Sequence, residues 1–203
     1  SSEMIREALL EVTRVSFNRI SVDGDTSTND TCLVLANGLA GNPSITSQGA
    51  DYDAFLEALR ALCVEMARRI AADGEGAKHM ITCTVEGATD EAQAERIAKS
   101  VISSTLTKAA IFGADANWGR VLCAMGYSGE AFDPDKVDVS FISAAGSVAV
   151  CAQGRGLDFD EEAAKRILTE RDVTIAVAMG EGNGACTCWG CDITYDYIKI
   201  NGD

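Results

Sequence analysis

The sequence is poor in basic residues. Its 17 Lys and Arg stand against 31 Asp and Glu, which leaves a formal net charge of −14. No run of basic residues is longer than a pair such as Arg68–Arg69. Binding to a nucleic-acid backbone or to an anionic membrane surface needs the opposite balance. We therefore expect neither nucleic acid nor membrane as a partner, whereas the charge leaves open what a small pocket binds.

The sequence also lacks a long apolar run. A helix that spans a bilayer needs about 20 consecutive apolar residues, and the apolar runs here are only a few residues long. No charged and then apolar leader opens the chain. We therefore expect a soluble protein that is not exported. Its 47% apolar residues, by contrast, are enough for one large core or two smaller ones.

Only one histidine, His79, accompanies eight cysteines. Three of the cysteines form the string Cys186-Thr-Cys188-Trp-Gly-Cys191, which looks like half of a metal or redox site. Zinc usually needs two separated ligand pairs, and the second pair is missing, so strand alternation explains the spacing better. We predict no metal site and reduced thiols, and a metal-binding module is the non-enzymatic alternative. The other five cysteines lie in apolar runs, where we expect burial: Cys32, Cys63, Cys83, Cys123 and Cys151.

The spacing of apolar residues predicts an α/β or α+β fold with mixed sheets. Residues 3–18 and 53–72 repeat apolar side chains every three or four positions, which is typical of helices. A short apolar strand is expected at 32–36. After Gly76 the elements become shorter, and the change of rhythm near Ala77 is the only candidate domain boundary. The expected strands there are 79–86, 121–127, 137–142, 148–153, 173–179 and 186–200, the last with a break, and the expected helices are 90–108 and 160–170.

Two loops carry side chains that suit a functional site. Residues 23–31 are all polar or Gly, and local turn structure and a role in a site explain them equally well. In Asp73-Gly74-Glu75-Gly76 the glycines let the backbone approach a ligand closely. A carboxylate held there is a natural partner for an ammonium group. On the sequence alone, a solvent-exposed loop glutamate is the simpler interpretation of Glu75.

Five longer strings identify a family. VDGDTSTNDT, ADGEGA, IFGADANWGR, CAMGYSG and WGCDITYDYIKIN, in this order and spacing, closely resemble the β chain of the ornithine acetyltransferase family over essentially the whole chain. The resemblance implies layered sheets and helices of the autoprocessing aminopeptidase type. Residues 1–76 would belong to a main layered α/β domain completed by an α chain. Residues 77–203 would form a smaller C-terminal α/β domain whose tail returns to the active site.

The same resemblance implies a bifunctional glutamate N-acetyltransferase of arginine biosynthesis. In that family a precursor cleaves itself before a threonine, whose hydroxyl is the nucleophile and whose new amine is the general base. The acetyl group passes from N-acetylornithine to this threonine and then to glutamate, and some members also accept acetyl-CoA as a co-substrate. No cofactor is implied. A hydrolase of similar architecture, an aminopeptidase or amidohydrolase that gives the acyl group to water, is the alternative.

The resemblance also implies the site residues and the partner. Glu75 and Asn201 match the family's substrate-binding Glu and Asn. The chain opens at Ser1, already at its first helix, so we expect the nucleophilic Thr upstream of Ser1 and assign no catalytic residue within the chain. The family works as an α2β2 assembly of α and β chains. We expect it in the cytoplasm, or in the mitochondrial matrix for a fungal member.

Overall fold

The computed structural model describes residues 1–202. A seven-stranded mixed sheet forms its centre, in the order β1-β7-β2-β6-β3-β4-β5. The pairs β1–β7 and β2–β6 are parallel, and the others are antiparallel. The strands are β1 (Ile20–Ser21), β2 (Met80–Ala88), β3 (Asp138–Ser143), β4 (Gly146–Ala152), β5 (Arg155–Gly156), β6 (Asp172–Ala178) and β7 (Gly184–Cys191). The mixed α/β fold predicted from the sequence is confirmed.

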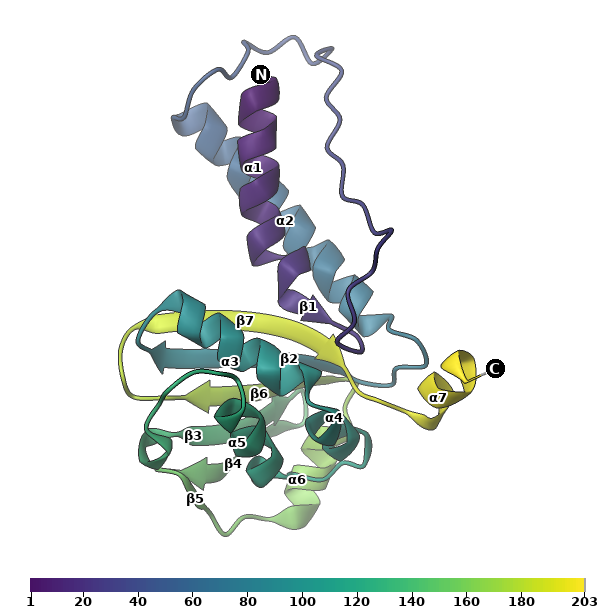
Figure 1. Ribbon diagram of the computed structural model, residues 1–203, viewed down its shortest axis with the longest axis vertical. Helices are drawn as coiled ribbons and strands as arrows, with labels where there is room; N and C mark the ends of the chain where they lie inside the picture. Colours follow the sequence, from purple (N-terminus) through teal and green to yellow (C-terminus); the bar gives the residue numbers. More distant parts are fainter. Residues whose placement is uncertain (203) are drawn as a thin grey trace.

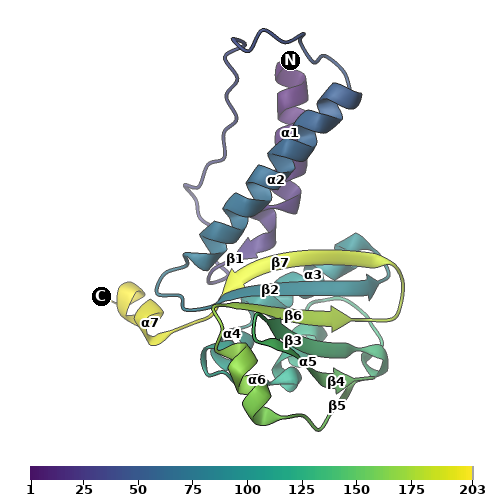
Figure 2. The ribbon, with the colours of Figure 1, turned by 180° about the vertical axis from the view of Figure 1, so that it is seen from behind.

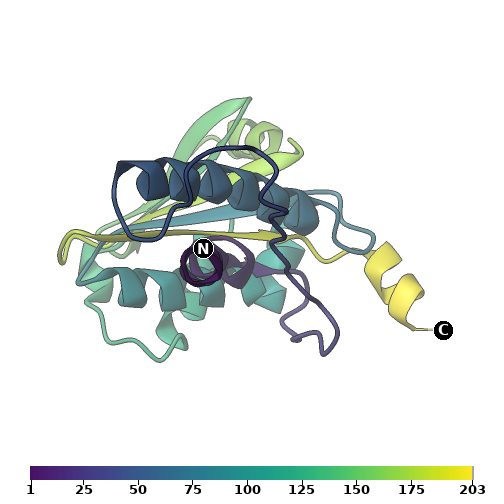
Figure 3. The same cartoon turned by 90° about the horizontal axis from the view of Figure 1, so that it is seen from above.

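Helices cover both faces of this sheet (Figures 1 and 2). One face carries α3 (Glu91–Ser103), α4 (Thr105–Phe112) and α5 (Trp118–Gly126), and the other carries α6 (Glu161–Leu168). Seen from above, α2 (Ala50–Ala72) lies on the side opposite α3 (Figure 3). It packs against α1 (Ser2–Val15), and the pair projects away from the sheet, whereas α7 (Tyr195–Asn201) stands at its side. Within residues 1–202, none of the helices combines the length and the apolar character that crossing a membrane requires.

The main core lies between the sheet and α3. Alternate residues of β2 point to opposite faces, and Ile81, Cys83 and Val85 are fully buried against a face that includes Ile97 and Val101 of α3. Burial of an aliphatic side chain of this size contributes about 1.5–3 kcal/mol. A second, smaller cluster joins α1 to α2 through Met4, Ala8 and Tyr52. The domain boundary expected near Ala77 falls in the loop before β2, and the division into domains stays a prediction.

Most of the predicted elements are confirmed, and one is divided in two. The expected helix 90–108 is interrupted at Ser104, whose backbone is extended. The Ser104 hydroxyl accepts a hydrogen bond from the Thr107 backbone N–H, 3.3 Å away, and so caps the start of α4.

Three expected strands are wrong in whole or in part. Residues 121–126 of the expected strand 121–127 belong to α5, which is capped by the Asn117 side chain. The prediction failed because a short apolar run does not distinguish a strand from a buried helix. Residues 32–36 have no strand partner among residues 1–202. The last expected strand, 186–200, ends at Cys191. Its second half forms α7, whose first turn is capped by the Thr194 hydroxyl.

Candidate functional site

Three segments that are distant in the sequence meet at one end of the sheet. The parallel strands β1 and β7 both deliver the residues that follow them to this end, and β2, antiparallel to β7, starts from it. The turn at residues 22–25, the loop at 73–79 and the tail at 192–201 therefore lie together (Figures 1 and 2). Both predicted substrate-binding residues lie in these segments.

The structure brings Glu75 and Asn201 into direct contact. The Asn201 Nδ2 donates a hydrogen bond to Glu75 Oε2 at 2.6 Å, across 126 positions of sequence. The same nitrogen donates to the Tyr197 carbonyl oxygen at 3.1 Å, which fixes the amide against its own helix. Both side chains are exposed. The pair can therefore meet a ligand from solvent with a carboxylate and the oxygen of an amide, although their roles stay predictions.

The glycines on either side of Glu75 serve a close approach, but to the chain itself. Gly76 has a φ of +68°, and a Cβ there would lie 2.8 Å from the Tyr197 backbone nitrogen. A Cβ on Gly74 would lie 2.6 Å from the Cys191 sulfur. The close approach that these glycines suggested is thus made to the tail of the same chain, and Glu75 itself is exposed, as the simpler interpretation expected. The glycines hold Glu75 against α7.

Two hydroxyl groups connect the tail to the other segments. Thr194 Oγ1 donates to the Gly76 carbonyl oxygen at 2.8 Å. The Tyr197 hydroxyl donates to Asp23 Oδ2 at 3.1 Å, which links α7 to the turn after β1. Burial, followed by the Asp23 carboxylate, raises the pKa of Tyr197 and keeps its hydroxyl protonated. Local sequence patterns indicated neither residue, because each contact crosses more than a hundred positions.

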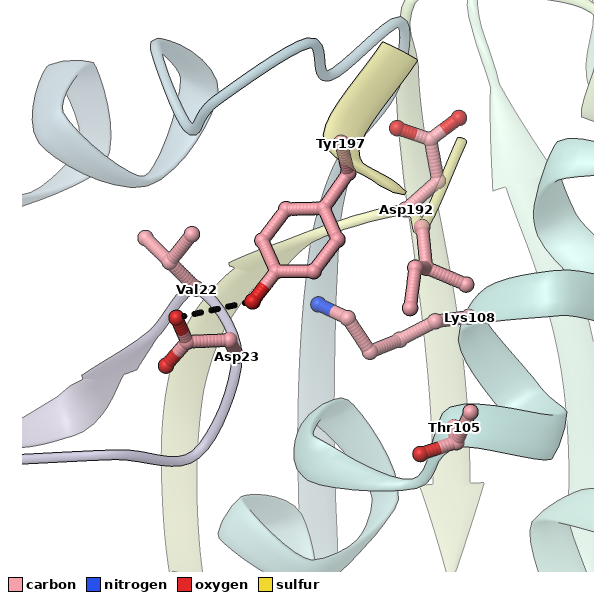
Figure 4. A pocket seen from close by; sticks show the side chains of 7 residues that line it. Val22, Asp23, Thr105, Lys108, Asp192 and Tyr197 are labelled. Carbon is pink, nitrogen blue, oxygen red and sulfur yellow. Dashed lines mark hydrogen bonds between the residues drawn. The ribbon is translucent and has the colours of Figure 1, made fainter. Parts of the chain in front are cut away.

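A small pocket of about 60 Å³ lies beside Tyr197. Figure 4 shows Asp23, Lys108, Asp192 and Tyr197 around it, with the Lys108 ammonium group pointing toward Tyr197. Thr105 from the first turn of α4 lines it as well. The pocket mixes one cation with carboxylates and hydroxyls, so it suits a small polar group.

Lys108 is a buried cation that sequence reasoning missed. Its side chain donates to the Cys191 carbonyl oxygen at the end of β7, and only 3% of the residue is exposed. Burial lowers the pKa of Lys108, and the nearby Cys191, Asp192 and Asp23 oppose the shift. The signal that could have found it is a lysine within the apolar string LTKAAIF.

Asp192 fixes the start of β2 to the end of β7. Its carboxylate accepts hydrogen bonds from the backbone N–H groups of Lys78 and His79, at 2.9 and 3.0 Å, and its Oδ2 lies 2.7 Å from His79 Nδ1. Burial alone would raise the pKa of Asp192, but the hydrogen bonds from His79 and Lys78 outweigh it and hold that pKa below its usual value. The charge is therefore part of the framework that positions Glu75.

The loop at residues 23–31 shows both the local turn structure and the contact with the candidate site that the sequence left open. Asp23 Oδ1 accepts from the Asp25 N–H at 2.9 Å, and Ser27 Oγ accepts from the N–H groups of Asn29 and Asp30, at 3.1 and 3.2 Å. These are the local turns expected of short polar side chains. The other Asp23 oxygen accepts from Tyr197 and lines the pocket. Only the first residue of the loop reaches the candidate site.

The cysteines form no ligand set. All eight are free, and Cys186 and Cys188 face the core with their sulfur atoms 3.9 Å apart. No group of three metal-binding side chains occurs in the part of the chain that the structure describes. Burial of Cys63, Cys83 and Cys151 is confirmed, whereas Cys32 and Cys123 are exposed, contrary to expectation. Alternation along β7 accounts for the pair Cys186 and Cys188.

Curated proteins of known name are similar to this chain in sequence. The chain is 52% identical over 202 residues to the arginine biosynthesis bifunctional protein ArgJ 1 of Clostridium acetobutylicum, covering 100% of the chain and 50% of that protein. It is 52% identical over 198 residues to the bifunctional protein ArgJ of Symbiobacterium thermophilum, covering 98% of the chain and 48% of that protein. The chain thus spans about half the length of the curated relatives it matches.

A solved structure and a family model also match the chain. The crystal structure of arginine biosynthesis bifunctional protein ArgJ from Bacillus halodurans is 43% identical and superimposes with a TM-score of 0.93, covering 100% of this chain and 93% of that one. The model of the ArgJ family matches residues 1–203. From the sequence match, the shared fold and the family model together, the chain belongs to the ArgJ family.

Proposed function

We propose that the chain is the β chain of an acetyltransferase that moves an acetyl group from N-acetylornithine to glutamate. The observation that carries the proposal is the hydrogen bond between Asn201 and Glu75, which joins the two residues that match the family's substrate-binding strings. Family membership supports it, since the relatives are named bifunctional proteins of arginine biosynthesis. The reaction needs no cofactor, and acetyl-CoA is a further acetyl donor to test.

In the proposed cycle the chain binds and orients substrates. The exposed Glu75 carboxylate takes the side-chain ammonium group of N-acetylornithine, an interaction between opposite charges. Asn201 can donate and accept at once, so it suits substrates with a carboxylate and an acylated nitrogen. A threonine hydroxyl outside residues 1–203 attacks the acetyl carbon, its amine takes the proton, and ornithine leaves. The amine of glutamate then takes the acetyl group from the threonine.

The proposed partner is an α chain, in an α2β2 assembly. Residues 32–36 support a partner, because they are an apolar segment without a strand neighbour in the described chain, and Leu33 and Leu35 are 73% and 90% exposed. The greater length of the relatives supports it too. The bacterial relatives favour the cytoplasm as the compartment, and they give the mitochondrial alternative no support.

The test is Glu75→Gln in the chain assembled with its proposed partner. Loss of a charge-assisted hydrogen bond costs about 1.5–3 kcal/mol, so kcat/KM for N-acetylornithine should fall by roughly ten- to a hundredfold. N-Acetylnorvaline lacks the side-chain ammonium group, and its use should be equal in both proteins. Glu170→Gln, an exposed glutamate after α6, is the control and should leave both substrates unaffected.

The same assay separates transfer from hydrolysis. With glutamate present the acetyl group should appear as N-acetylglutamate, and without it turnover should stop after the enzyme is acetylated. Steady release of acetate at the same rate with and without glutamate would favour the hydrolase. An unchanged kcat/KM in Glu75→Gln would leave Glu75 as a loop residue that only contacts α7.

A further inference from the structure

We infer that Thr194 is a positioning residue that sets the geometry of the Glu75–Asn201 pair through one buried hydroxyl group. The inference rests on the proposed function, because it assigns Thr194 a role at the same substrate site. Thr194 lies between β7 and α7, and only 4% of it is exposed. Its backbone is extended, as expected for a helix N-cap.

The hydroxyl makes two hydrogen bonds that point in different directions. Thr194 Oγ1 donates to the Gly76 carbonyl oxygen at 2.8 Å, and it accepts from the Tyr197 backbone N–H at 3.2 Å. A hydroxyl has one donor and two acceptor positions, so both bonds form at once. A single group thus holds the loop before β2 and the first turn of α7.

These bonds close a ring that contains the substrate pair. Gly76 is the neighbour of Glu75, and Glu75 accepts from the Asn201 amide. The same amide donates to the Tyr197 carbonyl oxygen, and the Tyr197 N–H returns to Thr194. Displacement of the Thr194 end of the ring therefore changes the position of Asn201 relative to Glu75.

The tail depends on this ring because α7 has few other contacts with the rest of the described chain, among them the edge-to-face contact of the Tyr195 ring with Phe112, whose centres are 5.5 Å apart. The helix has seven residues, too few to be stable alone in water, and none of them is buried. Two other side-chain hydrogen bonds join α7 to the remainder of the described chain, from Tyr197 to Asp23 and from Asn201 to Glu75. Both are made by exposed or half-buried groups. Thr194 supplies the buried attachment, which water cannot readily replace.

Thr194→Val tests the inference in the chain assembled with its proposed partner. Valine keeps the shape and removes both hydrogen bonds. We expect the KM for N-acetylornithine to rise about tenfold, while kcat changes less than about threefold, because binding geometry is lost and the reacting group is untouched. Thr194→Ser restores the hydroxyl and should restore the KM.

Thr169→Val is the matched control. Thr169 also caps a helix and donates its hydroxyl to a backbone carbonyl, that of Lys165 at 2.7 Å, but it does so at the C-terminal end of α6, away from the site. The KM of Thr169→Val for N-acetylornithine should equal that of the wild type. If Thr194→Val does not fold, Thr194→Gly removes the same donor and keeps a tolerated N-cap, so it gives the same measurement.

Coupling to Glu75 decides between positioning and general stability. In a Glu75→Gln background, Thr194→Val should change KM less than about twofold, because the pair it positions no longer binds the ammonium group. A full tenfold effect in that background, or an unchanged KM in the single variant, would overturn the inference. A wild-type assembly that transfers no acetyl group would instead overturn the proposed function.

Hydrogen exchange gives a readout that does not need turnover. The Tyr197 amide should exchange faster in Thr194→Val than in the wild type and in Thr169→Val, because it loses its acceptor. Equal exchange in all three proteins would show that the hydroxyl does not hold α7, and it would overturn the inference whatever the enzyme's activity.

Discussion

Asp192 shows how one buried carboxylate stabilises the fold near the site. Its folded-state pKa lies below the usual value, since the hydrogen bonds from His79 and Lys78 outweigh the effect of burial. A lowered carboxyl pKa contributes stability that is present above the unfolded pKa, about 3.9, and is lost as the pH falls through the folded pKa. The contribution of Asp192 is therefore complete at neutral pH.

Asp192→Asn should lower the free energy of unfolding at pH 7 by about 1–3 kcal/mol, because an amide cannot accept as many bonds from His79 and its neighbour. The loss of stability of the wild type between about pH 4 and pH 2 should be shallower in the variant. Urea unfolding over this pH range measures both effects. The exposed Asp158→Asn is the control, and equal pH dependence in all three proteins would contradict the assignment.

At the scale of residues, only those site residues that lie in the sequence strings shared with the family could be predicted. Glu75 and Asn201 follow from the resemblance, and the loop glycines mark a close approach. Lys108, Thr194 and Tyr197 act through contacts that span 83, 118 and 174 positions, respectively. No local pattern encodes such contacts, because they depend on which strands become neighbours in the sheet.

At the scale of elements, a helix cap determined the secondary structure of a segment whose residue propensities favour a strand. Residues 195–200 contain Tyr and Ile, which favour strands, yet they form α7. Thr194 caps its first turn, and Lys199 lies 3.3 Å from Asp196 one turn earlier. Residues 53–72, in contrast, were predictable as a helix because a long apolar repeat is unambiguous.

Gly76→Ala should destabilise the contact between the loop and α7. Alanine is strained at a φ of +68°, and its Cβ would meet the Tyr197 nitrogen at 2.8 Å. We expect a loss of more than about 1 kcal/mol in the free energy of unfolding and faster tryptic cleavage after Lys199. Gly126→Ala is the control, since a Cβ at the end of α5 meets nothing within 4 Å. If both variants behave alike, the close approach of the loop does not hold the tail.

At the scale of the whole molecule, the unpaired segment at residues 32–36 is the feature that the chain alone does not explain. The strand predicted for these residues is not formed, and no strand of residues 1–202 pairs with the segment. Val34 and Leu35 line a groove of about 750 Å³ together with Met4 and Phe55 of α1 and α2. Leu33 and Leu35 are exposed. A continuous run of apolar residues is typical of a strand that is buried inside a sheet.

We therefore expect the proposed α chain to add a strand beside residues 32–36 and to cover the two leucines. Leu35→Lys should weaken association of the two chains by about tenfold or more, because burial of a leucine contributes about 1.5–3 kcal/mol. Leu157→Lys, an exposed leucine at the far edge of the sheet, should leave association unchanged. Analytical ultracentrifugation of the separately purified chains measures the effect. Amides of residues 32–36 should also exchange slowly in the assembly and fast in the free chain, since only the assembly gives them strand partners. Fast exchange in both states would mean that the partner binds elsewhere on the molecule.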